Sequence, residues 1–138
     1  MGFKRRCFEK GLPGAYIVVD STKRYFKDFS LRITGTDEHI PLKSSAYKTV
    51  YCRKTVHEFN KPDKMAEELK RIMSVDGILI ISEEIPLFEN EIDPGCKKML
   101  KTSNEIINLF TSHGLKLSSS DTTTWKQNRN LFILKFRK

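Results

Sequence analysis

Residues 57–86, "HEFNKPDKMAEELKRIMSVDGILIISEEIP", combine the signals of a helix with those of a buried strand. Asn60 is expected to cap the helix, because Pro62 and Asp63 follow it in the first turn. One face of this helix is apolar at helical spacing: Met65, Ala66, Leu69, Ile72 and Met73. After "SVDG", the run "ILIIS" is continuously apolar, as in a strand covered on both faces. The stretch therefore predicts a helix that leads into the centre of a sheet.

Outward from this stretch, strand and helix patterns alternate over the whole chain. Apolar or β-branched strands are predicted at 15–20, 30–34, 47–53, 115–120 and 130–138. Helices are predicted at 2–10, after a cap at Ser21 or Thr22, and over 96–112. This alternation predicts an α/β sandwich with a mostly parallel sheet, and the last two strands are expected to form an antiparallel hairpin at one edge.

Length and composition restrict the class of protein. The chain has 138 residues, which predicts a single domain over 1–138. It has no apolar run long enough for a membrane span, and its first residues lack the apolar stretch of a secretory signal. The cysteines Cys7, Cys52 and Cys96 are odd in number and widely spaced, without the spacing of a metal motif. We therefore predict reduced thiols, no metal site and a cytoplasmic location.

The net charge of +8 is distributed unevenly along the chain. Residues 1–54 carry 12 basic and 5 acidic side chains, and residues 96–138 carry 9 and 2. Residues 55–95 are acidic, with 4 basic and 10 acidic side chains. A basic face of this kind attracts nucleic-acid phosphates, but a solvated lysine-rich surface gives the same pattern. Trp125 presents the same choice between stacking on a base and packing over the hairpin.

Three segments resemble class I S-adenosylmethionine-dependent methyltransferases, specifically the type 11-like group. Residues 57–86 resemble the family's central helix, turn and buried strand, with Gly77 as the one glycine kept in the turn. Residues 34–52 resemble the stretch that precedes and forms the family's fourth strand, and "YIVVDST" at 16–22 resembles its second strand. The resemblance runs from about residue 8 to 138 and implies a three-layer Rossmann-like sheet with S-adenosylmethionine as the cofactor.

The resemblance also implies cofactor-binding residues. Asp20 ends the second strand, where the family's acid accepts hydrogen bonds from both ribose hydroxyls, and Ser21 follows it. The alternative for Asp20 is a helix cap. The acid expected near the adenine aligns with Thr36, and Asp37 or Glu38 substitutes for it after a shift of one or two positions.

The end of the 47–53 strand falls at the family's active-site rim. Arg53 and Lys54 are predicted there to meet an anionic acceptor or the cofactor carboxylate. His57 is predicted to act as a base or to orient a substrate, although packing against a loop is the alternative. The methyl acceptor and the catalytic residues cannot be named from these residues.

The sequence departs from the family pattern because the 138 residues contain no G-x-G-x-G loop. We therefore expect a domain shortened at its amino terminus, with a six-stranded sheet in the order 3-2-4-5-7-6 by the family's strand numbers. Cofactor binding is expected to be weak and catalysis to be weak or lost. The alternatives are a non-catalytic partner of another methyltransferase subunit and a basic RNA-binding protein. A homodimer is a further expectation, because an unpaired internal sheet edge favours association.

Overall fold

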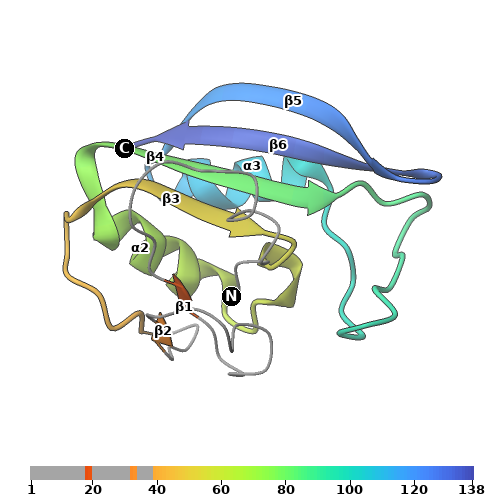
Figure 1. Ribbon diagram of the computed structural model, residues 1–138, viewed down its shortest axis with the longest axis horizontal. Coiled ribbons are helices and arrows are strands. Elements are labelled where there is room, and N and C mark those ends of the chain that lie inside the picture. Colours follow the sequence, from red (N-terminus) through yellow and green to blue (C-terminus); the bar gives the residue numbers. More distant parts are fainter. Residues whose placement is uncertain (1–17, 20–31, 34–38) are drawn as a thin grey trace.

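The computed structural model describes residues 18–19, 32–33 and 39–138 (Figure 1). The predicted helices at 2–10 and after Ser21 or Thr22 lie outside these residues. The described elements follow the chain in the order β1 (Val18–Val19), β2 (Arg32–Ile33), β3 (Tyr47–Arg53), the 3₁₀ turn η1 (Val56–Glu58), α2 (Pro62–Ile72), β4 (Met73–Glu84), α3 (Ser103–Ser112), β5 (Lys116–Lys126) and β6 (Arg129–Arg137). Neither α-helix in the described ranges has the length and apolar character needed to cross a bilayer.

The main sheet has four strands in the order β3-β4-β6-β5. β3 and β4 are parallel, whereas β4–β6 and β6–β5 are antiparallel. In the family's numbers this order is 4-5-7-6, as predicted, and the mixed α/β fold is confirmed. β1 and β2 pair in parallel, as predicted for the second and third strands, but they form a separate sheet in the described residues (Figure 1).

One part of the predicted topology is not seen among the described residues. The second strand was expected to pair directly with the fourth, but β1 pairs only with β2 there. The described strands therefore form two sheets rather than one sheet of six. Of the predicted strand over 15–20, the described residues are Val18 and Val19, which pair with Arg32 and Ile33.

A single hydrophobic core lies between the helices and one face of the main sheet. Phe136 of β6 and Phe110 of α3 are fully buried, with ring centroids 5.2 Å apart. Alternate residues of β3, β4 and β6 face this core, because successive side chains of a strand point to opposite faces of a sheet. The buried residues of these strands on this face include Val50, Cys52, Leu79, Ile81, Phe132 and Leu134. The predicted apolar face of α2 is confirmed, since Met65, Ala66, Leu69, Ile72 and Met73 are all buried.

Both helix starts differ from the prediction. α2 begins at Pro62 after Lys61, and Asn60 is not its cap, because the Asn60 side chain instead accepts a hydrogen bond from Lys98 Nζ at 2.5 Å. α3 begins only at Ser103, so the predicted helix over 96–112 is too long by seven residues.

A capping box explains the late start of α3. The Thr102 hydroxyl accepts from Glu105 N at 3.2 Å, and the Glu105 carboxylate accepts from Thr102 N at 2.7 Å. This reciprocal pair satisfies the backbone N–H groups of Thr102 and Glu105 and fixes the first turn of the helix there. The apolar residues before it, Cys96 to Leu100, belong to the preceding loop. The predicted helix end is confirmed by Gly114, which has φ +86° just beyond it.

The terminal hairpin is confirmed, but its strands are longer than predicted. Residues 121–129 were expected to form the connection, whereas β5 continues to Lys126 and only Gln127 and Asn128 lie between the strands. Asn128 has φ 62°, the left-handed conformation that two-residue hairpin turns require. The run "TTTW" favours a strand because its residues are β-branched or aromatic. Trp125 therefore belongs to β5 and not to a loop.

The predicted turn "SVDG", residues 74–77, forms an irregularity within β4. Tyr47 pairs with Met73, and the next pair on the ladder is Thr49 with Ile78, so residues 74–77 leave the register. A Cβ at Gly77 would lie 2.9 Å from the carbonyl oxygen of Ser74. Glycine is needed here because the backbone passes too close for any side chain.

Candidate functional site

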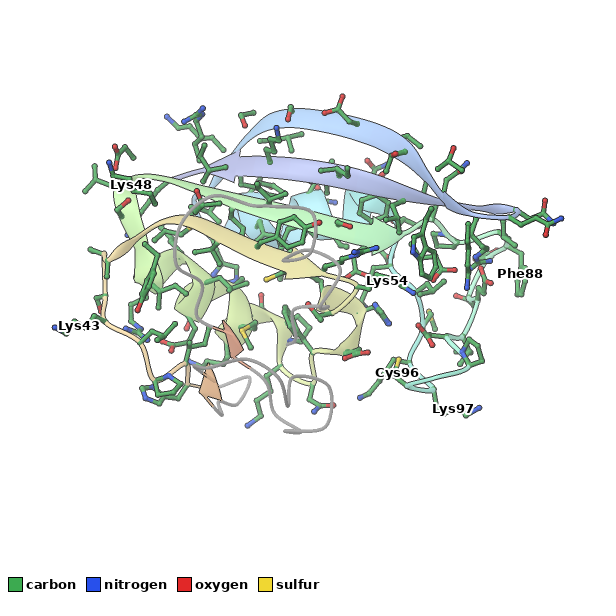
Figure 2. All side chains as sticks on the ribbon, viewed as in Figure 1. Lys43, Lys48, Lys54, Phe88, Cys96 and Lys97 are labelled. Carbon is green, nitrogen blue, oxygen red and sulfur yellow. The ribbon has the colours of Figure 1, made fainter. Side chains whose placement is uncertain are left out.

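The carboxyl ends of β3 and β4 lie side by side, because the two strands are parallel and adjacent. Open α/β sheets bind ligands at this edge. Lys54 follows β3 with φ 50°, and its backbone N–H donates to Ser82 O of β4 at 2.6 Å. Figure 2 shows Lys54 at this end of β3, with Cys96 on the loop that follows β4.

Glu83, near the end of β4, organises the turn that follows β3. The residue is 1% exposed, and its Oε1 accepts from the backbone N–H groups of Thr55 at 2.7 Å and Val56 at 2.5 Å. Its Oε2 accepts from His57 Nδ1 at 2.7 Å. A buried carboxylate is tolerated when several donors surround it, and here three do. Glu83 therefore fixes residues 55–57 against β4.

His57 is held between two carboxylates. Its side chain is fully buried, and Nε2 lies 3.3 Å from Asp93 Oδ2 without the geometry of a hydrogen bond. Burial lowers the pKa of His57, but the hydrogen bond to Glu83 and the charges of Glu83, Glu58 and Asp93 outweigh it, so the pKa is raised. Burial is the main cause that raises the pKa of Glu58.

Asp93 and Cys96 complete this group from the loop between β4 and α3. Asp93 Oδ1 accepts from Gly95 N at 2.7 Å and Cys96 N at 3.4 Å. Burial opposes ionisation of Asp93, but these bonds and the charges of His57 and Lys54 keep its pKa below the usual value. His57, Asp93 and Cys96 bring one possible ligand atom each within 4.8 Å of one another. Motif spacing in the sequence did not indicate this group, since 39 positions separate His57 from Cys96.

A second cluster of charged side chains lies between the end of β3 and the β5–β6 hairpin. Lys54 Nζ lies 3.1 Å from Glu84 Oε2 and 3.6 Å from the centroid of the Trp125 ring. Arg129 Nε donates to the other oxygen of Glu84, and Arg129 Nη1 donates to Glu91 at 2.7 Å. Lys54 is only 10% exposed and is already paired with an anion. It is therefore engaged within the protein in this conformation.

The structure brings together only part of the predicted site. Arg53, Lys54 and His57 lie at the carboxyl edge, as predicted, but the His57 side chain is buried and does not line an open rim. The predicted cofactor residues Asp20, Ser21, Thr36, Asp37 and Glu38 lie outside the described residues.

Several residues of the site were missed from the sequence. Glu83 and Glu84 form two consecutive acids at the end of an apolar strand, a signal that could have drawn attention to them. Asp93 and Arg129 gave no comparable signal, because loops and a hairpin bring them to this edge.

A surface cavity of about 690 Å³ lies beside this edge, between the loop after β4 and the hairpin. Its lining combines apolar residues such as Leu87, Phe88 and Phe132 with polar ones such as Thr102 and Thr122. Leu87 and Phe88 are 61% and 64% exposed, so the mouth of the cavity is apolar.

Residues 15–81 match a protein family described as a methyltransferase domain. The matched segment includes the predicted ribose-binding acid, β3, α2 and most of β4. No curated protein matches the sequence.

Solved structures of methyltransferases share the fold at low sequence identity. A SAM-dependent methyltransferase from Thermotoga maritima, described as a possible histamine N-methyltransferase, is 16% identical with a TM-score of 0.73, over 87% of this chain and 72% of that one. A methyltransferase from Haloferax volcanii, solved in complex with the Trm112 activator, is 11% identical with a TM-score of 0.69, over 94% and 75%. The [4+2]-cyclase SpnF is 11% identical with a TM-score of 0.62, over 78% and 57%.

The family model matches residues 15–81, just under half of the chain, and the solved methyltransferases share the fold, in agreement with the resemblance noted in the sequence. The chain spans 57% to 75% of the length of these three solved chains. The cyclase shows that this fold by itself does not fix the reaction.

Proposed function

We propose that this chain is a methyltransferase domain that binds S-adenosylmethionine at the carboxyl edge of its strands. The observation that carries the proposal is the family match over residues 15–81, which spans the predicted ribose-binding strand and the end of β3 together. The single domain over 1–138 and the cytoplasmic location remain parts of the same proposal.

The cofactor contacts follow from the positions of the residues along the sequence. Asp20 accepts hydrogen bonds from the ribose hydroxyls, with Ser21 beside it. Thr36, Asp37 or Glu38 meets the adenine, and Arg53 meets the cofactor carboxylate. Charge assistance makes the bonds to Asp20 and Arg53 the strongest of this set.

Methyl transfer requires mainly that donor and acceptor be held in line. The described residues at this edge supply positioning. Glu83 fixes residues 55–57 through two backbone N–H groups and His57, so the end of β3 keeps one conformation. His57 is therefore a positioning residue in this proposal and not a base in contact with the acceptor. The 138 residues contain no G-x-G-x-G loop, and we expect the cofactor affinity of this chain alone to be low.

Titration calorimetry with S-adenosylmethionine and S-adenosylhomocysteine tests the proposal. Both ligands should release or absorb heat, and Asp20→Ala should weaken binding by about 1.5–3 kcal/mol, the scale of a charged hydrogen bond. Asp28→Ala, which removes an acid not assigned to the cofactor, should bind like the wild type. Absence of heat at millimolar ligand would overturn the proposal.

A second candidate function is a non-catalytic partner of another methyltransferase subunit. The observation that favours it is the mutual pairing of Lys54, Glu84, Arg129 and Glu91, which engages these charges at the carboxyl edge. One structural neighbour was solved with an activator protein, so heteromers occur on this fold. A chain that binds no cofactor but raises the activity of a co-purified methyltransferase would support this role. Light scattering separately tests the homodimer.

RNA binding remains the third candidate, on the basis of the two basic flanks. Binding that depends on phosphates must weaken as salt is added. Filter binding to a single-stranded RNA between low and moderate salt tests this, and an affinity that does not change with salt would exclude it.

A further inference from the structure

We propose that His57, Asp93 and Cys96 bind a divalent cation, with Zn²⁺ as the best match to their donor set. Their ligand atoms are an imidazole nitrogen, a carboxylate oxygen and a sulfur, and all lie within 4.8 Å of one another. Zn²⁺ accepts all three atom types, whereas Ca²⁺ and Mg²⁺ prefer oxygen alone.

His57 carries the strongest evidence for such a site. Its Nε2 is buried and has no hydrogen-bond partner in the described residues, although a buried polar nitrogen normally has one. Its Nδ1 donates to Glu83 at 2.7 Å. Histidine ligands of metals usually make this second bond to a carboxylate, because it fixes the tautomer and leaves Nε2 free to coordinate.

Asp93 is oriented for the same role. Its Oδ1 is occupied by the N–H groups of Gly95 and Cys96, so Oδ2 points toward His57. The distance between Oδ2 and Nε2 is 3.3 Å. Two ligands at ordinary zinc distances in a tetrahedron lie about 3.4 Å apart, so these two atoms already have the required separation.

Charge favours a cation at this position. The carboxylates of Glu83 and Asp93 flank the His57 ring on its two nitrogen sides, and the Cys96 sulfur would add a third negative charge as a thiolate. Binding would release the thiol proton, and the second imidazole proton where His57 is protonated, so metal affinity rises with pH. Three protein ligands leave a fourth position for water or another ligand, as in open zinc sites.

The test is cobalt substitution of the purified full chain, kept reduced and first treated with a chelator. Co²⁺ should bind one equivalent and give a thiolate-to-cobalt charge-transfer band in the near ultraviolet, which Zn²⁺ should remove. Cys96→Ser should abolish the band, and Asp93→Asn should weaken Co²⁺ binding at least tenfold. Glu89→Gln, which removes an exposed acid of the same loop, should change neither property.

Circular dichroism of each variant establishes that it is folded. The proposal is overturned if the folded wild type binds no Co²⁺ or Zn²⁺, which would leave His57 as an ion-paired imidazolium between Glu83 and Asp93. It is equally overturned if the band persists in Cys96→Ser. These measurements contain no S-adenosylmethionine, so they stand or fall independently of the proposed cofactor binding.

Discussion

The two ends of the β3–β4 strand pair are stabilised in different ways. At the amino end, Arg71 of α2 donates to the backbone carbonyls of Ile40 at 2.8 Å and Leu42 at 2.9 Å, and to both oxygens of Glu68. Its side chain is 30% exposed, so water competes with these contacts. Arg71 therefore links α2 to the segment that leads into β3 through two backbone carbonyls and the side chains of Glu68 and Ser44.

At the carboxyl end, charged side chains meet one another away from water. Glu83 and His57 are buried as a pair, with Asp93 facing the second ring nitrogen. Taking such groups out of water is costly unless every partner is present. The largely buried charges of Glu83, His57 and Asp93 thus lie at the edge where parallel strands bind ligands. The opposite end is held instead by the partly exposed contacts of Arg71.

Substitution of Glu83, which binds both the turn after β3 and His57, should have the largest effect on the free energy of unfolding. Glu83→Gln replaces one acceptor oxygen with an amide that faces either backbone N–H or imidazole donors, and it removes the negative charge beside the buried His57. We expect a loss of about 3–5 kcal/mol in the free energy of unfolding. Urea denaturation at neutral pH with a chelator measures it.

The matched control is Glu89→Gln on the exposed loop after β4, which should change stability by less than about 0.5 kcal/mol. If both variants have the same stability, Glu83 does not organise the carboxyl end.

Breaking the Arg71 contacts at the amino end should cost less. Arg71→Ala removes charged hydrogen bonds to Ile40 O, Leu42 O and Glu68, for an expected loss of about 1.5–3 kcal/mol. Lys64→Ala removes an exposed cation of the same helix and should have little effect. A loss larger than that of Glu83→Gln would reverse the comparison between the two ends. Urea denaturation of both variants provides the test.

The capping box of α3 should contribute about 1 kcal/mol. Thr102→Ala removes the hydroxyl that accepts from Glu105 N, while Asn104→Ala changes an exposed residue outside the box. Thermal unfolding should separate the two variants. Equal melting temperatures would mean that the cap does not determine where α3 begins.

The smallest effect is a dependence on pH. The pKa of His57 is raised in the folded state, so its protonated form is stabilised by folding. Its contribution is therefore complete below the unfolded value of about 6.5 and is lost as pH rises through the folded value. The stability difference between wild type and His57→Gln, measured with a chelator, should shrink from pH 6 toward pH 9. A difference that grows over this range would contradict the raised pKa.

The sequence predicts elements well where a single periodic pattern decides them. The apolar face of α2 and the apolar run of β4 are local signals, and the helix and the strand are both confirmed, although Ile78 and Ile80 are only half-buried where coverage on both faces was predicted. The helix predicted over 96–112 failed because apolar spacing continues through a loop, and only the Thr102–Glu105 capping box marks the true start. The candidate cation ligands His57, Asp93 and Cys96 could not be predicted from a local pattern, because the fold brings His57 to the loop that carries the other two.

Hydrogen exchange with and without saturating S-adenosylhomocysteine tests the central claim most directly, because it compares both ends of the β3–β4 pair in one experiment. The proposed function predicts slower exchange in peptides that contain residues 53–58 and in those that contain Asp20 or Thr36–Glu38. Peptides covering residues 42–48 and 74–77 at the amino end should be unaffected. Protection confined to the amino end, or none at any peptide, would contradict a cofactor site at the carboxyl edge.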